Sequence, residues 1–360
     1  MIELLYRKLI LFNSIVFFVL CLFIELFFGD WFSENNFGYQ MIHKRLLNYK
    51  IESSFNNEKY NFIYVRNFFG FRMDENIEPR DIKIVFEGGS TGDETPLPEK
   101  LTIVGNLNRL LENIDAKLLV ANASVNGKST KGYINDFKFW FPQLNNFRPK
   151  VVIFYSGHND ADVLSDYNLK NNNFEIDIEN KTFREGKLEN IIDYIVNNSF
   201  FISKTKQIKN VYLDMDKEKV VYDLNKKELY KNFKYVDYDE AKYLYDQREM
   251  NIRQEKTLLF YRKNLEELKY FLDKYVIIPI FVTQIKYDGL SSKRLYLINE
   301  ETKKFANVNS YKIVKLDEIY KPEVGDFFDD LHTTPKGSEK IANIIFNEIK
   351  EKLYNVVNNN

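Results

Sequence analysis

Cysteine, histidine and charge of one sign are all scarce in this chain of 360 residues. There is one cysteine, Cys21, and there are three histidines. A single cysteine excludes an intramolecular disulfide, and no His, Cys or carboxylate set has metal-ligand spacing, so we expect no metal or other cofactor. The 51 Lys and Arg are balanced by 52 Asp and Glu, for a formal net charge of -1. This balance removes the basic surface that nucleic-acid binding requires, so we expect no nucleic-acid partner.

Long apolar runs are missing after the first 30 residues, and a mean hydropathy of -0.40 leaves room for one membrane span at most. That one run reads LILFNSIVFFVLCLFIELFFG from Leu9 to Gly29. Its helical length of about 31 Å matches a hydrocarbon core of roughly 30 Å. A buried core helix and a cleaved signal peptide are the alternatives. We expect an uncleaved signal anchor, because the run is apolar on every face and no small-x-small cleavage site follows Phe28.

The charges that flank this run predict its orientation. Arg7 and Lys8 precede it, whereas Asp30 and Glu34 follow it. The positive-inside rule then places the N-terminus in the cytoplasm and the remainder of the chain outside, in the periplasm or at the cell surface. The basic residues at 43–45 weaken this orientation slightly.

The rest of the chain divides by its hydrophobic pattern. Residues 31–80 show no long periodic run, and we interpret them as a stalk or packing arm. From residue 81 to 356, short apolar strands alternate with amphipathic helices, which predicts one α/β domain with a mostly parallel sheet. Residues 161–246 break the alternation and are interpreted as a helical insertion. This insertion is either a solvated elaboration or a lid whose tyrosines stack on sugar rings.

The expected strands and helices of this domain place several polar motifs. Strands are predicted at 81–86, 117–123, 151–155, 279–284 and 311–316, and helices after Pro98, over 133–144, over 258–275 and from Pro335. Three strands are followed directly by GGSTG (88–92), NASVNG (122–127) and SGHND (156–160), and the loop before the last helix contains DDLHTT (329–334). Ligands bind at the carboxyl ends of the strands in open α/β sheets, so these loops predict a single site.

The residue types in these loops suit nucleophilic catalysis. A serine hydroxyl needs a base to take its proton and a carboxylate to orient that base, and Ser90, His332 and Asp329 supply the three. A tetrahedral oxyanion needs several donors aimed at one point. The amides of Ser90 and Gly127 and the side chain of Asn159 are of that kind.

Other readings of these motifs are less favoured. His43 is interpreted as a surface residue and His158 as a structural or substrate-side residue, which leaves His332 as the base. Asp160 is expected to be a capping or network carboxylate. The run Gly127 to Thr130 imitates the end of a nucleotide-binding P-loop, but the glycine that such a loop needs five positions earlier is Asn122.

In this order, the four motifs resemble the blocks of the SGNH (GDSL-type) hydrolase superfamily, over about residues 82–345. The resemblance implies a three-layer α/β/α, flavodoxin-like fold with a five-stranded sheet. It also implies Ser90 as nucleophile, Asp329 and His332 as the base pair, and Gly127 and Asn159 as oxyanion donors. One departure is Gly89, where many relatives carry Asp. The segment NFFGFR (67–72) also looks like membrane-anchored members associated with envelope glycans.

The resemblance implies a serine esterase that acts on acyl esters, with an O-acetylated envelope polysaccharide as the expected substrate. An O-acyltransferase with the same triad and a glycan acceptor is the first alternative. A non-catalytic glycan-binding or assembly protein is the second, and the complete triad argues against it.

Overall fold

The computed structural model describes residues 2–29, 31, 47–55, 58–73, 77–114, 118–162, 195, 199–202, 205, 220–224 and 234–358. A five-stranded parallel sheet forms its centre, in the strand order β4-β3-β5-β7-β8. Its strands are β3 (Ile84–Gly88), β4 (Val120–Asn122), β5 (Val151–Tyr155), β7 (Ile278–Val282) and β8 (Lys312–Val314). The predicted fold class is confirmed. Because the strand order reverses next to β3, the carboxyl ends of β3, β4 and β5 form a topological switch point.

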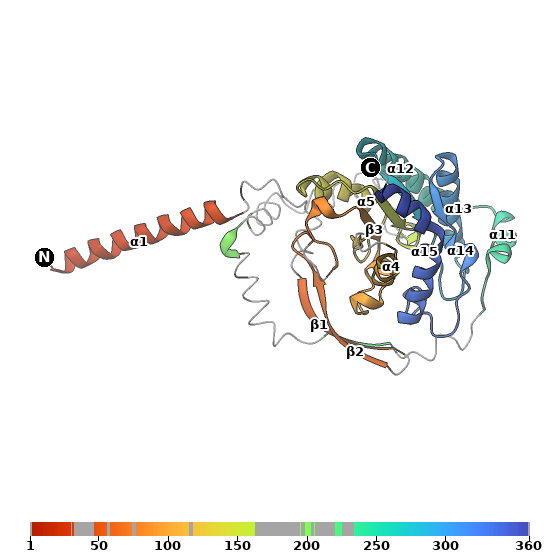
Figure 1. Ribbon diagram of the computed structural model, residues 1–360, viewed down its shortest axis with the longest axis horizontal. Helices are drawn as coiled ribbons and strands as arrows, with labels where there is room; N and C mark the ends of the chain where they lie inside the picture. The colour runs from red at the N-terminus through yellow and green to blue at the C-terminus, as the bar shows by residue number, and fades with distance from the viewer. Residues whose placement is uncertain are drawn as a thin grey trace.

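Helices cover both faces of this sheet and complete three layers (Figure 1). One face packs against α4 (Ile103–Glu112) and α15 (Pro335–Asn358), whose apolar stripes meet alternate strand residues such as Ile84 and Ile153. The opposite face packs against α5 (Thr130–Asn135), α12 (Ile252–Tyr275) and α13 (Lys293–Val308). Four further α-helices of this part of the chain are short: α3 (Ser90–Asp93), α6 (His158–Asp162), α11 (Tyr238–Asp246) and α14 (Leu316–Ile319).

The helix predicted over 133–144 is interrupted in the structure. The α-helical part ends at Asn135, a π-helical turn follows over Asp136–Trp140, and a 3-10 turn covers Phe141–Gln143. Asp136 directs its carboxylate to a buried lysine, and Trp140 donates its indole N–H to Phe69 O at 2.9 Å. These two tertiary contacts, together with the proline at 142, account for the departure from a regular helix.

A second sheet lies outside the predicted elements. Strands β1 (Leu47–Phe55) and β2 (Glu58–Arg66) form an antiparallel hairpin, and β6 (Val220–Asp223) adds to β1 in parallel. The part of residues 31–80 interpreted as a stalk or packing arm therefore contains a β-hairpin. Arg66, only 1% exposed, ties it to the domain through an ion pair with Asp93 of 2.7 Å. Most of the insertion at 161–246 lies outside the described residues. The predicted domain limits stay a prediction.

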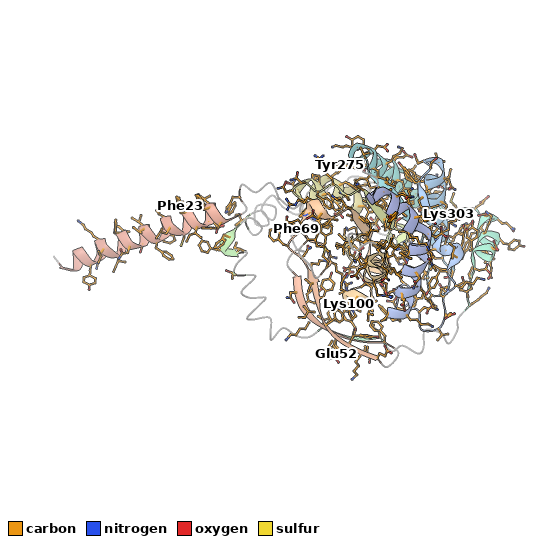
Figure 2. The ribbon with its side chains drawn as sticks, in the orientation of Figure 1. Phe23, Glu52, Phe69, Lys100, Tyr275 and Lys303 are labelled. Carbon is orange, nitrogen blue, oxygen red and sulfur yellow. The ribbon has the colours of Figure 1, made fainter. Side chains whose placement is uncertain are left out.

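The helix α1 (Ile2–Phe28) extends away from the rest of the chain (Figure 1). Its stretch Tyr6–Phe28 has a mean hydropathy of 2.6 and is not buried, and side chains such as Phe23 point outward (Figure 2). Near its end, Glu25 accepts hydrogen bonds from the backbone N–H groups of Phe200 and Phe201. By length and composition, this helix suits a membrane anchor or a signal sequence.

Candidate active site

The turn after β3 places Ser90 at the carboxyl edge of the sheet. Gly88 ends the strand and Ser90 is the first residue of α3, so the chain changes from strand to helix within two residues. The amide of Asn122, at the end of the neighbouring strand β4, donates to Gly92 O at 2.9 Å. The end of β4 is thereby joined to α3, and the Ser90 hydroxyl faces the loop before α15.

Ser90, His332 and Asp329 form one chain of hydrogen bonds. His332 Nε2 lies 2.8 Å from Ser90 Oγ, and His332 Nδ1 lies 2.7 Å from Asp329 Oδ2. The second carboxylate oxygen of Asp329 accepts the backbone N–H groups of Leu331 (2.8 Å) and His332 (2.6 Å). This arrangement favours the tautomer in which Nδ1 carries the proton and Nε2 accepts from the serine.

The surroundings of Asp329 keep it ionised. Burial acts to raise the pKa of this carboxyl, but hydrogen bonds from the His332 ring and from two backbone N–H groups lower it below its usual value. The ring of Phe328 stacks on the His332 ring, with centroids 5.7 Å apart and planes 11° from parallel. The imidazole is therefore held by an ionised partner at one nitrogen and by an aromatic ring on its face.

The structure also brings the predicted oxyanion donors near Ser90. Gly127 lines the same cavity as Ser90 and has a φ of +77°, a conformation that glycine adopts without strain. Asn159 Nδ2 donates to Lys128 O at 2.8 Å. The second N–H of this amide makes no hydrogen bond with the described residues.

Gly89 allows Asn159 to lie against the serine turn. A Cβ at position 89 would stand 2.0 Å from Asn159 Nδ2 and 3.1 Å from Lys128 O. Any side chain here would displace the amide. Glycine at position 89 thus permits a close contact between the serine turn and Asn159.

A cavity of about 510 Å³ opens over the triad. Ser90, Asp329 and His332 form one side of it, and Thr95, Asn126 and Gly127 belong to the polar part of its lining. Tyr222, Leu224 and Phe328 add apolar surface. Tyr222 belongs to β6 and Leu224 directly follows it, so the insertion, for which a solvated elaboration and a lid were both left open, contributes to the lining of this cavity.

A buried ion cluster beneath the site was also missed by the sequence analysis. Lys128 is 8% exposed, and its ammonium donates to Glu87 (2.9 Å), to Asp136 (2.5 Å) and to Ala123 O (2.6 Å). Burial raises the pKa of Glu87 well above its usual value, against the opposing effect of the nearby lysine. Lys128 directly follows Gly127, and its backbone carbonyl accepts from Asn159 of α6. The cluster therefore fixes the loop that carries Gly127 and the carbonyl that orients the Asn159 amide.

Glu94 connects the serine turn to the histidine loop. It is 3% exposed and accepts from Thr333 Oγ1 (2.9 Å), Ser338 Oγ (2.5 Å) and the backbone N–H of Ile103 (2.6 Å). Burial raises its pKa to about 7, although these hydrogen bonds act to lower it. Thr333 follows His332, so this contact helps to set the position of the imidazole.

The remaining sequence candidates fall outside the triad. The backbone N–H of His158 donates to Gln284 Oε1 at 2.7 Å, and His158 does not line the cavity. Asp160 accepts from Thr130 Oγ1 at 2.6 Å, as expected of a network carboxylate, and burial raises its pKa to about 6. His43 lies outside the described residues. In the described part of the chain, no group of three His, Cys or acidic residues is placed to hold a metal ion.

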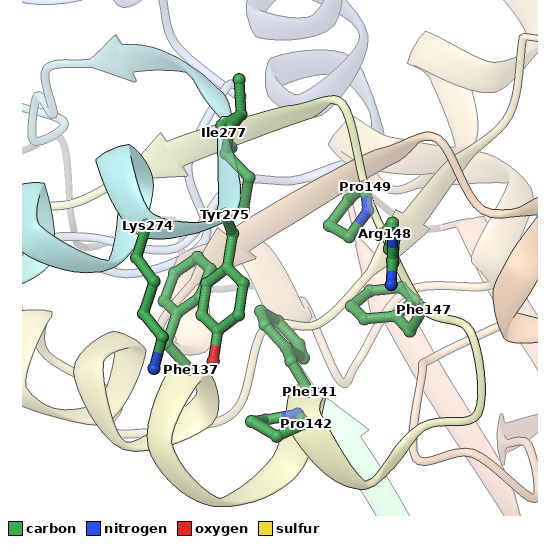
Figure 3. A pocket seen from close by; sticks show the side chains of 10 residues that line it. Phe137, Phe141, Pro142, Phe147, Arg148, Pro149, Lys274, Tyr275 and Ile277 are labelled. Atoms are coloured by element: carbon green, nitrogen blue, oxygen red, sulfur yellow. The ribbon is translucent and has the colours of Figure 1, made fainter.

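A second cavity, of about 400 Å³, lies at the opposite edge of the sheet (Figure 3). Its lining comes from the segments that lead into β5 and β7, and the ring of Tyr275 stacks on Phe137 within it, with centroids 6.3 Å apart. None of the four motifs contributes to it. This cavity is therefore separate from the one that Ser90, Asp329 and His332 line.

Comparisons with known proteins find no matching family model and no matching curated protein. Solved structures that are similar include a lipase/acylhydrolase from Enterococcus faecalis, with 13% identity, 75% of this chain and 96% of that chain covered, and a TM-score of 0.40. An acetyl xylan esterase, AlAXEase, has 14% identity, 74% and 98% coverage and a TM-score of 0.39. A member of the lipolytic G-D-S-L family from Veillonella parvula has 13% identity, 75% and 98% coverage and a TM-score of 0.39.

Proposed function

We propose that this protein is a serine esterase of the SGNH type that hydrolyses acyl esters. The observation that carries this proposal is the hydrogen-bonded chain from Ser90 through His332 to Asp329, at the switch point of the parallel sheet. Each residue is of the type that its place in such a chain requires.

In the proposed reaction, Ser90 Oγ attacks the ester carbonyl while His332 Nε2 takes the hydroxyl proton. Asp329 keeps the other ring nitrogen protonated and stabilises the imidazolium. The amides of Ser90 and Gly127 and the side chain of Asn159 donate to the oxyanion. His332 returns the proton to the departing alcohol, and water then releases the acid from Ser90 by the same steps in reverse.

The proposed substrate is an O-acetylated polysaccharide of the cell envelope. The support is the resemblance of the NFFGFR segment to envelope-glycan members and the apolar N-terminal helix, which would hold the catalytic domain at a membrane. The charges around that helix favour a cytoplasmic N-terminus and an extracytoplasmic domain.

Hydrolysis of p-nitrophenyl acetate by the full chain in detergent tests the proposed chemistry. We expect Ser90→Ala to remove the activity while leaving the melting temperature close to that of the wild type. Ser129, which directly precedes α5 and lies outside the cavity lining, provides a matched serine-to-alanine control. Equal rates for the wild type and Ser90→Ala would overturn the serine mechanism.

A further inference from the structure

The edge strand β6 forms one wall of the active-site cavity. It pairs in parallel with β1, from Ile51 opposite Val220 to Ser54 opposite Asp223. Two further hydrogen bonds continue this pairing: Leu224 N donates to Ser54 O and Ser54 Oγ donates to Asp223 Oδ1, both at 3.1 Å. The wall therefore has a defined register, although its two strands lie far apart in the sequence.

The register decides which side chains of β6 face the cavity. Tyr222 and Leu224 are half-buried and line it together with Ser90 and His332, whereas Val221 is 63% exposed on the opposite face. Side chains alternate across a strand, so a shift of one residue would exchange these faces. Tyr222 is thus placed over the triad by the pairing of β6 with β1.

Apolar packing holds this wall against the catalytic loop. Leu224 packs on a small cluster of Phe55, Leu97 and Phe328, and Phe328 in turn stacks on the His332 ring. Burial, followed by the negative charge of Asp93, raises the pKa of Tyr222 above its usual value, so its hydroxyl stays neutral. The cavity therefore presents a neutral aromatic ring two residues before a leucine that packs beside the catalytic loop.

The size and lining of the cavity indicate what lies against this ring. A volume of about 510 Å³ far exceeds the space that an acetyl group fills, so most of it is available to the alcohol part of an ester. Thr95 and Asn126, which are within hydrogen-bond distance of each other at 3.3 Å, offer polar groups in the same lining. One flat aromatic wall with nearby hydroxyl and amide groups suits a ring that has apolar C–H faces and polar edges.

We propose that Tyr222 is a specificity-determining residue that stacks on a pyranose ring in the alcohol part of the ester. This inference rests on the proposed esterase function and adds to it the sugar subsite and the strand that builds it. Insertion strand β6 is then part of the substrate-binding site.

The test compares two kinds of acetyl ester with the full chain in detergent. One substrate is a mixture of mono-O-acetylated methyl glucopyranosides and the other is triacetin, which has no ring; acetate release is measured for both. We expect Tyr222→Ala to lower kcat/KM for the pyranosides about tenfold more than for triacetin, chiefly through KM. Tyr222→Phe should restore the preference, and the outward-facing control Val221→Ala should keep it.

Three results would overturn the inference. The first is an equal loss on both substrates in Tyr222→Ala, which would indicate a merely structural role for the tyrosine. The second is hydrolysis of triacetin but not of the pyranosides by the wild type. The third is an unchanged kcat/KM for both substrates in Tyr222→Ala. If the wild type hydrolyses neither ester, the proposed esterase function itself fails, so the two failures are distinguishable.

Discussion

Gly89→Ala should displace Asn159, a proposed oxyanion donor, without changing a residue of the triad. The new Cβ would stand 2.0 Å from Asn159 Nδ2, a separation that folded proteins do not tolerate, so the amide has to move. The φ of Gly89 is -89°, outside the left-handed region, so alanine introduces no strain in φ. The effect of the substitution is therefore steric, and it falls on Asn159.

The expected magnitude follows from what one such donor contributes. Loss of a single oxyanion donor lowers kcat by about 10² to 10³, equivalent to roughly 3 to 4 kcal/mol of transition-state stabilisation. We expect Gly89→Ala to reach the lower part of this range in p-nitrophenyl acetate hydrolysis, because a displaced amide can retain a weaker contact. KM should change little, since the oxyanion forms after the substrate binds.

A double-mutant cycle separates this explanation from a general distortion of the serine turn. If Gly89→Ala acts through Asn159, it should have almost no additional effect on kcat in an Asn159→Ala background. Melting temperatures of the three variants would show whether each is folded. A full additional loss in the double variant, or near-wild-type kcat in Asn159→Ala, would refute the reasoning.

Three further predictions concern groups around the site. Asp329→Asn should lower kcat by about 10⁴, because an amide favours the wrong tautomer of His332, and a loss below tenfold would contradict this. Lys128→Met should cost about 3 kcal/mol of unfolding free energy near pH 8 by leaving buried carboxylates unpaired. This cost should shrink at lower pH as those carboxylates take up protons, and a pH-independent cost would argue against the ion cluster. Burial raises the pKa of Glu94 from 4.5 to about 7, so the folded protein holds a proton on this carboxyl that the unfolded chain releases at lower pH. Glu94 therefore contributes to stability below pH 4.5, and this contribution is lost as the pH rises through 7. Glu94→Gln should therefore gain up to about 3 kcal/mol relative to the wild type in unfolding experiments between pH 5 and pH 8, and parallel curves would contradict the assignment.

The elements that sequence reasoning predicted well are those with a strong local pattern. The run VVIFY at Val151–Tyr155 is entirely apolar and is a strand with the predicted bounds, buried in the middle of the sheet. The site residues Ser90 and His332 lie far apart in the chain but in loops that parallel strands and the last helix bring to one edge. Their contact could be predicted because the topology of an α/β sheet leaves few places for such loops.

The elements that were missed depend on distant contacts. Strand β2 has aromatic residues at every second position, Tyr60, Phe62 and Tyr64. Its first residues are charged and polar, so the alternation is too short to stand out in the sequence. The partner of β6 could not be found from local pattern, since β1 lies much earlier in the chain. The buried charges of Lys128 and Glu87 leave no signal at all, because charged residues are exposed by default and only the folded structure supplies their partners.

The proposed stacking of Tyr222 on a sugar ring also bears on the choice between hydrolysis and acyl transfer. Both reactions pass through an acyl group on Ser90, and the product depends on which hydroxyl His332 activates next. Water is present at high concentration, so a sugar hydroxyl competes only when binding raises its effective concentration at the acyl carbon. Tyr222 lines the same cavity as Ser90 and His332, so a ring bound there shares that cavity with the acyl group. If the protein transfers acetyl groups, Tyr222→Ala should therefore shift the products from acetylated sugar toward free acetate. If it is a hydrolase, added sugar acceptor should leave acetate release from triacetin unchanged.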